Sequence, residues 1–170
     1  NGPYGVTISP DGSALFVADS GNHKIRRVEV ATGAVRTLAG SGTRGSADGV
    51  GGAAEFYRPF GIAISPDGSV LFVADISNHK IRRVEVATGA VGTLAGTGVA
   101  GFFNGLFNNP AGVAVSPDGA TLYVADYWNN RVREVRRRPS SPPAVHPRKR
   151  RCWNPVPLPF RPSPLRFLPR

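Results

Sequence analysis

Cysteine and methionine are almost missing from this sequence. The 170 residues include one cysteine, Cys152, and no methionine. A single cysteine excludes an intrachain disulfide and a cysteine cluster that would bind a metal ion. Because a natural reading frame starts with methionine and this chain starts with Asn1, we expect a processed chain or a fragment.

Long apolar runs are missing as well. No stretch approaches the ~18 apolar residues that a membrane-spanning helix needs. No signal-peptide pattern is visible either. The sequence therefore predicts no membrane span, and it leaves the compartment unknown.

Acidic residues are missing from the C-terminal part. All 11 Asp and Glu residues lie in residues 1–135, together with 11 of the 21 Lys and Arg residues. The net charge of +10 therefore belongs to residues 136–170. Charge counting thus gives no support for a basic nucleic-acid surface on residues 1–135, and we expect nucleic acid to bind only through the C-terminal part.

Residues 136–170 are rich in arginine and proline, with 10 prolines from Pro139 onward. Proline cannot donate to a β-ladder, and this composition is typical of disorder or polyproline II. The segment Arg136–Pro142 matches an SH3-type ligand pattern, and Arg148–Arg151 matches a basic import or nucleic-acid patch. The abrupt change of composition also fits a coding artefact without a selected role.

One stretch of about 25 residues occurs three times, at 5–30, 61–86 and 112–135. In the second copy, GIAISPDGSVLFVADISNHKIRRVEV, two polar turns separate three short runs of β-forming residues. Proline presets φ, aspartate can bond the backbone, and glycine accepts positive φ. The first-turn residues are Pro10, Asp11, Gly12, Pro66, Asp67, Gly68, Pro117, Asp118 and Gly119.

The pattern P-x-G-[VI]-x-[VI]-S-P-D-G followed by [LF]-[FY]-V-A-D-x-x-N-[HN]-[KR]-[IV]-R resembles the NHL repeat, a blade unit of β-propellers. The spacing of 56 and then 51 residues between Asp19, Asp75 and Asp126 is typical of such an array. The resemblance implies an all-β fold of four-stranded antiparallel blades. It also implies a ring of six blades, of which this chain would be about half.

The predicted organisation is a propeller segment over residues 1–135 and a disordered tail over 136–170. The first blade is expected at about 3–40 and the second at about 59–96. The third, at 110–135, lacks the sequence of a fourth strand after Val135. Within the third strand of a blade, Ile25 is followed by two arginines, which predicts a β-bulge or a phase slip there.

Glycine-rich links join the blades at 39–58 and 95–109. Phe56 and Phe107 each lie three residues before the proline that opens a blade, and we expect them to fill the gap between blades. Neither link carries a phosphate-binding GxxxxGK[ST] pattern.

Each repeat also carries an Asp-x-x-Asn turn. The carboxylates of these turns could form a ring around a cation or a substrate, or each could accept N–H groups within its own turn. One copy per blade in the same local context favours the turn interpretation, so we predict no metal site and no cofactor. The predicted turn residues are Asp19, Asn22, Asp75, Asn78, Asp126 and Asn129.

Variable residues inside these turns are the candidate binding surface. Tyr127 and Trp128 lead the set, because large amphipathic rings dominate interface energies; packing against a neighbouring blade is the alternative. His23 and His79 occupy turn exits in separate blades, which speaks against a shared metal. The full candidate set is Tyr127, Trp128, Ile76, His23, His79, Lys24 and Lys80.

The predicted function is a non-catalytic scaffold that binds another protein. One alternative is part of a six-bladed propeller hydrolase or lyase of the lactonase kind. A second alternative is an RNA-binding module. Either missing blades or self-association would be needed to close the ring.

Overall fold

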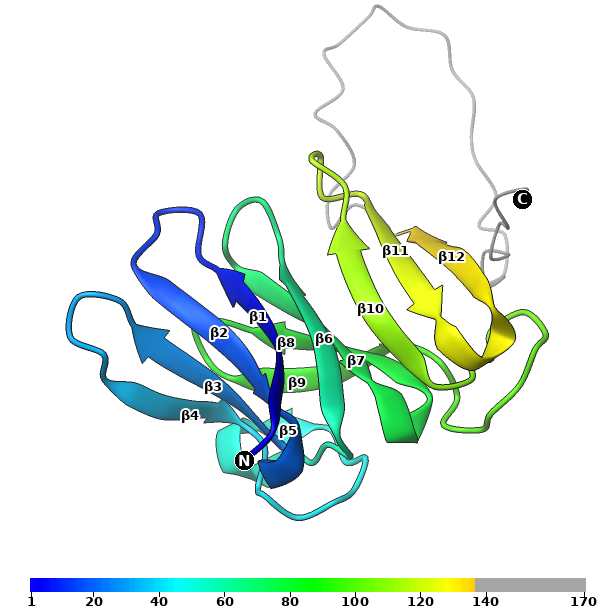
Figure 1. The fold of residues 1–170 in the computed structure, drawn as a ribbon, viewed down its shortest axis with the longest axis horizontal. Coiled ribbons are helices and arrows are strands. Elements are labelled where there is room, and N and C mark those ends of the chain that lie inside the picture. Colours follow the sequence, from blue (N-terminus) through cyan, green and yellow to red (C-terminus); the bar gives the residue numbers. More distant parts are fainter. Residues whose placement is uncertain (137–170) are drawn as a thin grey trace, which may run out of the picture.

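Three antiparallel β-sheets lie side by side in an arc in the computed structural model, which describes residues 1–136 (Figure 1). Each sheet contains one copy of the repeat, and the first strand of each repeat begins at a proline. We call the sheets blade 1, blade 2 and blade 3 in chain order. The all-β propeller fold predicted from the repeats is confirmed. Of the predicted tail, residues 136–170, only Arg136 is among the described residues, and residues 137–170 lie outside them.

Blade 1 contains four strands in simple sequential order. They are β1 (Pro3–Ile8), β2 (Ala14–Asp19), β3 (Lys24–Glu29) and β4 (Val35–Ala39). The turn from β1 to β2 is closed by Asp11, whose Oδ1 accepts the Ser13 N–H at 3.0 Å. Ser9 adds a second closure, because its Oγ accepts the Ala14 N–H at 2.9 Å. The Ser-Pro-Asp-Gly sequence thus reverses the chain through its own side chains.

Blade 2 contains five strands rather than the expected four. The strands of the repeat are β6 (Pro59–Ile64), β7 (Val70–Asp75), β8 (Lys80–Glu85) and β9 (Ala90–Ala95). The fifth, β5 (Gly49–Val50), belongs to the first link and pairs with β9 at the outer edge. The link is therefore part of the sheet and not only a connection.

Blade 3 contains three strands within the described residues: β10 (Pro110–Val115), β11 (Thr121–Asp126) and β12 (Arg131–Arg136). The register is regular between β11 and β12. In blades 1 and 2 the predicted irregularity is confirmed, because the pairing of β3 with β4 slips between Ile25 and Arg26, and that of β8 with β9 slips between Ile81 and Arg82.

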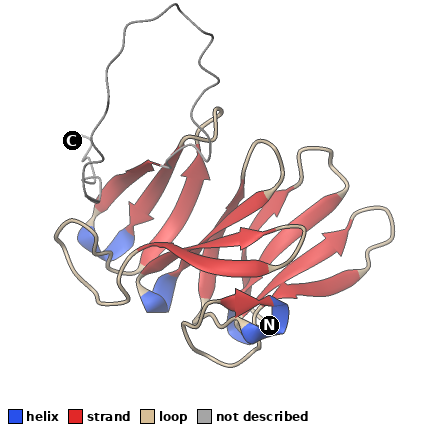
Figure 2. Ribbon diagram, turned by 180° about the vertical axis from the view of Figure 1, so that it is seen from behind, coloured by secondary structure: helices blue, strands red, loops and turns tan. Residues whose placement is uncertain are grey.

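Short 3-10 turns follow the second strand of every blade. They are η1 (Ser20–Asn22), η3 (Ile76–Asn78) and η4 (Tyr127–Asn129), and η2 (Gly51–Ala53) lies in the first link. Figure 2 shows these turns at the same end of the blades as the links, which we call the link face. None of these described helices has the length or the apolar surface to cross a membrane.

Two hydrophobic cores lie between neighbouring blades, and each combines side chains from two sheets. The first joins Phe16 and Ile25 of blade 1 to Leu71 and Val84 of blade 2. The second joins the opposite face of blade 2 to blade 3. Since side chains alternate along a strand, each blade offers one apolar face to each neighbour.

Phe56 and Phe107 are fully buried in these two cores, so the prediction that they fill the gaps between blades is confirmed. The inner strands also approach closely at glycines. A Cβ on Gly61 would lie 2.3 Å from the Ala111 oxygen of the next blade, which no side chain could accommodate without a shift of the backbone.

Candidate functional site

A buried carboxylate at the end of β7 joins blade 2 to the link that precedes it. Asp75 Oδ1 accepts the Tyr57 backbone N–H at 2.8 Å. Its Oδ2 accepts Asn78 Nδ2 at 2.8 Å and Arg82 Nη1 at 2.9 Å. Burial raises the pKa of Asp75, and the hydrogen bonds from Asn78, Tyr57 and Arg82 oppose that rise.

This geometry corrects one detail of the sequence interpretation. We expected Asp75 to accept N–H groups of its own turn, but no side chain caps η3, and the bonded backbone N–H lies 18 residues earlier. The carboxylate therefore closes its own turn through the Asn78 side chain and joins that turn to the link through the Tyr57 N–H.

Arg82 connects Asp75 to the backbone of the link. Its Nη1 donates to the Glu55 oxygen and its Nη2 to the Ala47 oxygen, each at 3.0 Å. Nη2 also lies 2.7 Å from Asp48 Oδ1. The guanidinium carbon is 5.3 Å from the centre of the Phe56 ring, a cation–π distance. One fully buried arginine therefore binds the carboxylate, the link backbone and the ring that fills the gap.

Blade 3 contains the same network, although the sequence of the link before it differs. Asp126 accepts the Asn108 N–H at 2.7 Å and Asn129 Nδ2 at 2.9 Å. Arg133 donates to Asp126 at 3.2 Å and to the Leu106 oxygen. Its guanidinium carbon lies 5.0 Å from the centre of the Phe107 ring. We call these two clusters, together with their phenylalanines, the link locks.

In blade 1 the same side chains are contacted by Asn1 and not by a link segment, as far as residues 1–136 show. Arg26 Nε donates to Asp19 Oδ2 at 2.8 Å, and the Asn1 ammonium donates to Asp19 Oδ1 at 2.9 Å. Partial burial raises the pKa of Asp19, but hydrogen bonds from Asn1, Asn22 and Arg26 outweigh it and lower that pKa to about 2. Arg26 is 27% exposed, whereas Arg82 and Arg133 are fully buried.

The candidate histidines are also attached to the links. His23 Nδ1 accepts the Arg58 N–H at 3.2 Å, and His79 Nδ1 accepts the Asn109 N–H at 3.1 Å. Both histidines have positive φ at the exit of a 3-10 turn. Burial lowers the pKa of His79, and the charge of Asp126 opposes that change. The structure thus gives both rings a partner in the backbone of the next blade's link.

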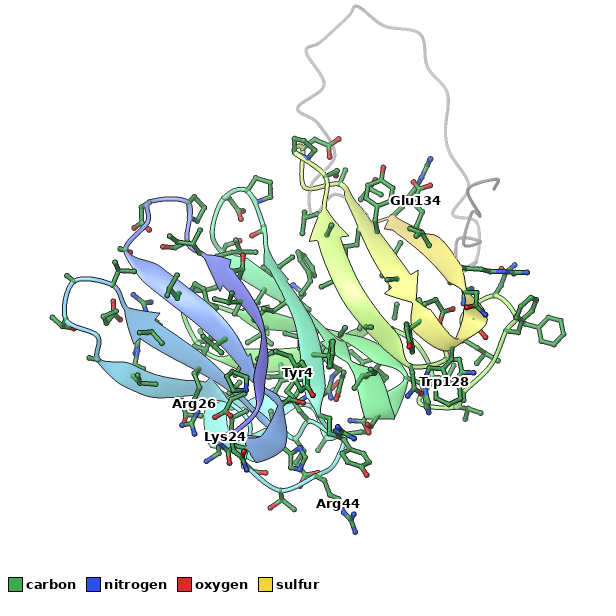
Figure 3. All side chains as sticks on the ribbon, in the orientation of Figure 1. Tyr4, Lys24, Arg26, Arg44, Trp128 and Glu134 are labelled. Carbon is green, nitrogen blue, oxygen red and sulfur yellow. The ribbon has the colours of Figure 1, made fainter. Side chains whose placement is uncertain are left out.

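Tyr127 and Trp128 are the most exposed members of the predicted binding set, each at 65%. Their backbone is held firmly, because the Trp128 N–H donates to the Asn108 oxygen at 3.1 Å and Asn129 donates to Asp126. Figure 3 shows Trp128 at the link face of blade 3. Ile76 occupies the same turn of blade 2 and is half-buried.

The two candidate lysines differ in their contacts. Lys80 Nζ donates to Ser46 Oγ at 3.0 Å, which ties it to the first link. Lys24 is half-buried at the equivalent place in blade 1. Over residues 1–136, no three His, Cys, Asp or Glu side chains come together as a group that could hold a metal ion.

Sequence reasoning missed the arginines of the link locks. Arg26, Arg82 and Arg133 follow the turn asparagine by four residues in every repeat. That recurrence could have identified them, since an arginine that interrupts the alternation of an apolar strand at the same place in each blade needs a buried partner.

The chain is similar in sequence to known proteins. The family model described as NHL repeat matches residues 107–134. The NHL repeat-containing protein 2 of Bos taurus is 38% identical over 147 residues, which cover 77% of this chain and 20% of the relative. The chloroplastic protein SUPPRESSOR OF QUENCHING 1 of Arabidopsis thaliana is 36% identical over 146 residues, covering 78% of this chain and 14% of the relative. The chain thus spans a fifth or less of these two relatives.

Solved structures show the same fold. A structural genomics protein of Bacteroides thetaiotaomicron superposes with a TM-score of 0.69 at 23% identity, covering 78% of this chain and 34% of that one. An auxiliary nutrient binding protein of Bacteroides ovatus superposes with a TM-score of 0.66 at 26% identity, covering 76% and 36%. On its three repeats, the matching family model and these relatives, the chain belongs to the NHL-repeat family of β-propellers.

Proposed function

We propose that this chain is a non-catalytic propeller segment that binds a protein partner through its link face. The observation that carries the proposal is the pair Tyr127 and Trp128, two large rings that are each 65% exposed on a fixed turn. Aromatic residues held rigid before binding contribute much area at little entropic cost. The lactonase-like and RNA-binding alternatives stay predictions of the sequence.

Further exposed aromatic surface lies on the same blade 3 side of the link face. Phe102 is 48% exposed, and the Arg131 guanidinium carbon lies 3.8 Å from the centre of its ring. Phe103 is 78% exposed beside it and meets Phe102 edge to face. Aromatic residues and arginine are enriched in protein interfaces, which is the chemistry that this part of the second link offers.

The experiment is a selection of peptides on the full chain from a random displayed library, followed by calorimetric titration of the selected peptides. Changing Trp128→Ala should weaken binding by at least about tenfold, the size of a hot spot. The matched control is Val30→Ala, which truncates a side chain that is 52% exposed at the other end of the blades. Equal affinities for Trp128→Ala and Val30→Ala would overturn the proposal.

A further inference from the structure

The first link carries arginines at two places where the second link carries uncharged residues. Arg44 and Ala100 are equivalent, because each forms an isolated parallel bridge with the buried phenylalanine of its own link. Arg58 and Asn109 are equivalent too, since each donates its backbone N–H to the turn histidine of the preceding blade. The two links therefore share a backbone frame and differ in the charge that they present.

Arg58 has a backbone conformation that arginine adopts only at a cost. Its φ is 58°, in the left-handed region. Five non-glycine residues within residues 1–136 have positive φ, and the other four are histidine or asparagine. Those two residue types are enriched in the left-handed region, whereas arginine is not. Strain of this kind persists where function requires the side chain, which indicates a role for the Arg58 guanidinium.

Two lysines add to the positive charge around the first link. Lys80 Nζ donates to a serine of this link at 3.0 Å. Lys24 lies against the start of the link, since a Cβ on Gly42 would be 2.9 Å from Lys24 Cε. Figure 3 shows Lys24 and Arg44 at the link face. Among the described residues, the guanidinium groups of Arg44 and Arg58 have neither a hydrogen bond nor an ion pair, so both can bind a ligand.

The acidic residues of the same link do not cancel this charge. Asp48 is bound to the buried Arg82, with Oδ1 and Nη2 2.7 Å apart. Glu55 lies against the link backbone, because a Cβ on Gly45 would be 2.0 Å from its Oε2. Asp48 and Glu55 thus face four basic residues around the link. Blades 1 and 2 both contact this link, so the surface does not depend on either end of the chain.

We propose that the first link binds an acidic segment of a protein partner, with Arg44 and Arg58 as the residues that select it. The inference rests on the proposed function, because it names the chemistry of a partner for the same link face. A guanidinium offers a planar pair of donors that matches a carboxylate. His23 adds a donor near the Arg58 backbone, since a neutral ring whose Nδ1 accepts carries its proton on Nε2.

A single-stranded nucleic acid fits this surface less well. Its bases need aromatic rings with free faces. The rings beside Arg58 contact one another instead: Tyr57 meets His23 edge to face at 5.8 Å, and Phe60 stacks on Tyr4 at 4.2 Å. The two carboxylates of the link would also repel a continuous phosphate chain, whereas a peptide can place its acidic side chains between them. We therefore assign the surface to a peptide.

The test is a titration of the isotope-labelled full chain with blocked hexaglutamate, followed through the amide NMR signals of Gly45, Tyr57 and Arg58. Signals of single residues separate this binding from any binding to the arginines of residues 136–170. We expect saturable shifts that weaken as salt is added, and none with blocked hexaglutamine. No saturable shift, or equal shifts with the two peptides, would overturn the proposal. Hexauridylate that binds these residues more tightly than hexaglutamate would also overturn it, in favour of a nucleic acid.

Two matched variants locate the binding. Arg58→Asn should weaken hexaglutamate binding by about fivefold at low salt. It should also raise the unfolding midpoint, because asparagine tolerates positive φ, so weaker binding could not be blamed on misfolding. The control is Arg36→Asn, which removes an arginine that is 60% exposed near the start of β4, at the other end of the blades. Equal weakening by the two variants would contradict the assignment.

The second link permits a test by gain of binding. Ala100→Arg combined with Asn109→Arg copies both arginines onto the same backbone frame, and hexaglutamate should then shift the amide signal of Gly101, the equivalent of Gly45. An unshifted Gly101 signal would contradict the role given to the arginines. The two proposals fail separately: selected peptides that bind through Trp128, without any hexaglutamate shift at the first link, would overturn this inference and leave the proposed function standing.

Discussion

Arg82 and Asp75 form a fully buried ion pair, with Nη1 and Oδ2 2.9 Å apart. The pair does not lie inside one sheet's core but at the boundary between blade 2 and the first link. Both charges lose water, and the Tyr57 N–H and two link carbonyls replace it. The stability of the arc therefore depends on the polar contacts of the links as well as on apolar packing.

Arg82→Met should lower the free energy of unfolding by about 3–5 kcal/mol, because it leaves the Asp75 carboxylate buried without its cation. Arg26→Met removes the equivalent residue of blade 1, which is 27% exposed. That change should cost only about 0–1 kcal/mol. Denaturant melts of both variants measure the difference, and equal costs would show that burial of the network does not matter.

Phe56→Ala should cost about 3–5 kcal/mol, because the ring is fully buried between blades 1 and 2. Phe103→Ala should change the stability by no more than about 0.5 kcal/mol, since that ring is 78% exposed. Thermal or denaturant unfolding distinguishes the two. A small effect of Phe56→Ala would mean that the links do not hold the blades together.

Gly61→Ala should destabilise the chain by about 1–3 kcal/mol, since its Cβ would overlap the Ala111 oxygen of the next inner strand. Gly92→Ala is the control, because nothing lies within 4 Å of a Cβ there. Alanine should be neutral or stabilising at Gly92, where it reduces the entropy of the unfolded chain. Unfolding midpoints of the two variants check the sign at each position.

The fold was predictable from the sequence because local and global signals agree. The Ser-Pro-Asp-Gly turns, the β-forming runs and the threefold repetition all indicate blades, and Phe56 and Phe107 could be placed by their distance from the next proline. The link locks could not be predicted in the same way. Tyr57 and Asp75 lie 18 residues apart, and only the folded sheet brings the link N–H to the carboxylate.

Two other features could not be predicted from the sequence, for a similar reason. The fifth strand of blade 2 is only Gly49–Val50, two residues in a glycine-rich link, and it forms because β9 offers an open edge. The role of His79 as an acceptor depends on Asn109, which adopts positive φ in the next link. Contacts between blades, rather than local preferences, decide both.

The contribution of the first turn to the stability of the chain should depend on pH. Hydrogen bonds from Ser9 and Ser13 lower the pKa of Asp11 from 3.8 to about 2. An acid whose pKa is lower in the folded state stabilises that state above its unfolded pKa and loses this contribution as the pH falls toward the folded pKa. The advantage of wild type over Asp11→Asn should thus be full above about pH 5 and should vanish near pH 2. Urea melts across that range check it, and a difference that grows on acidification would contradict the assignment.

The central claim is that buried carboxylates fasten each link to its blade and make the three blades one rigid arc. Residue-resolved hydrogen exchange of the Tyr57 and Asn108 amides tests it most directly, since these N–H groups donate to Asp75 and Asp126. The account predicts that both amides exchange only as fast as the whole chain unfolds. Exchange of either amide as fast as that of Gly105, on the exposed part of the second link, would contradict it.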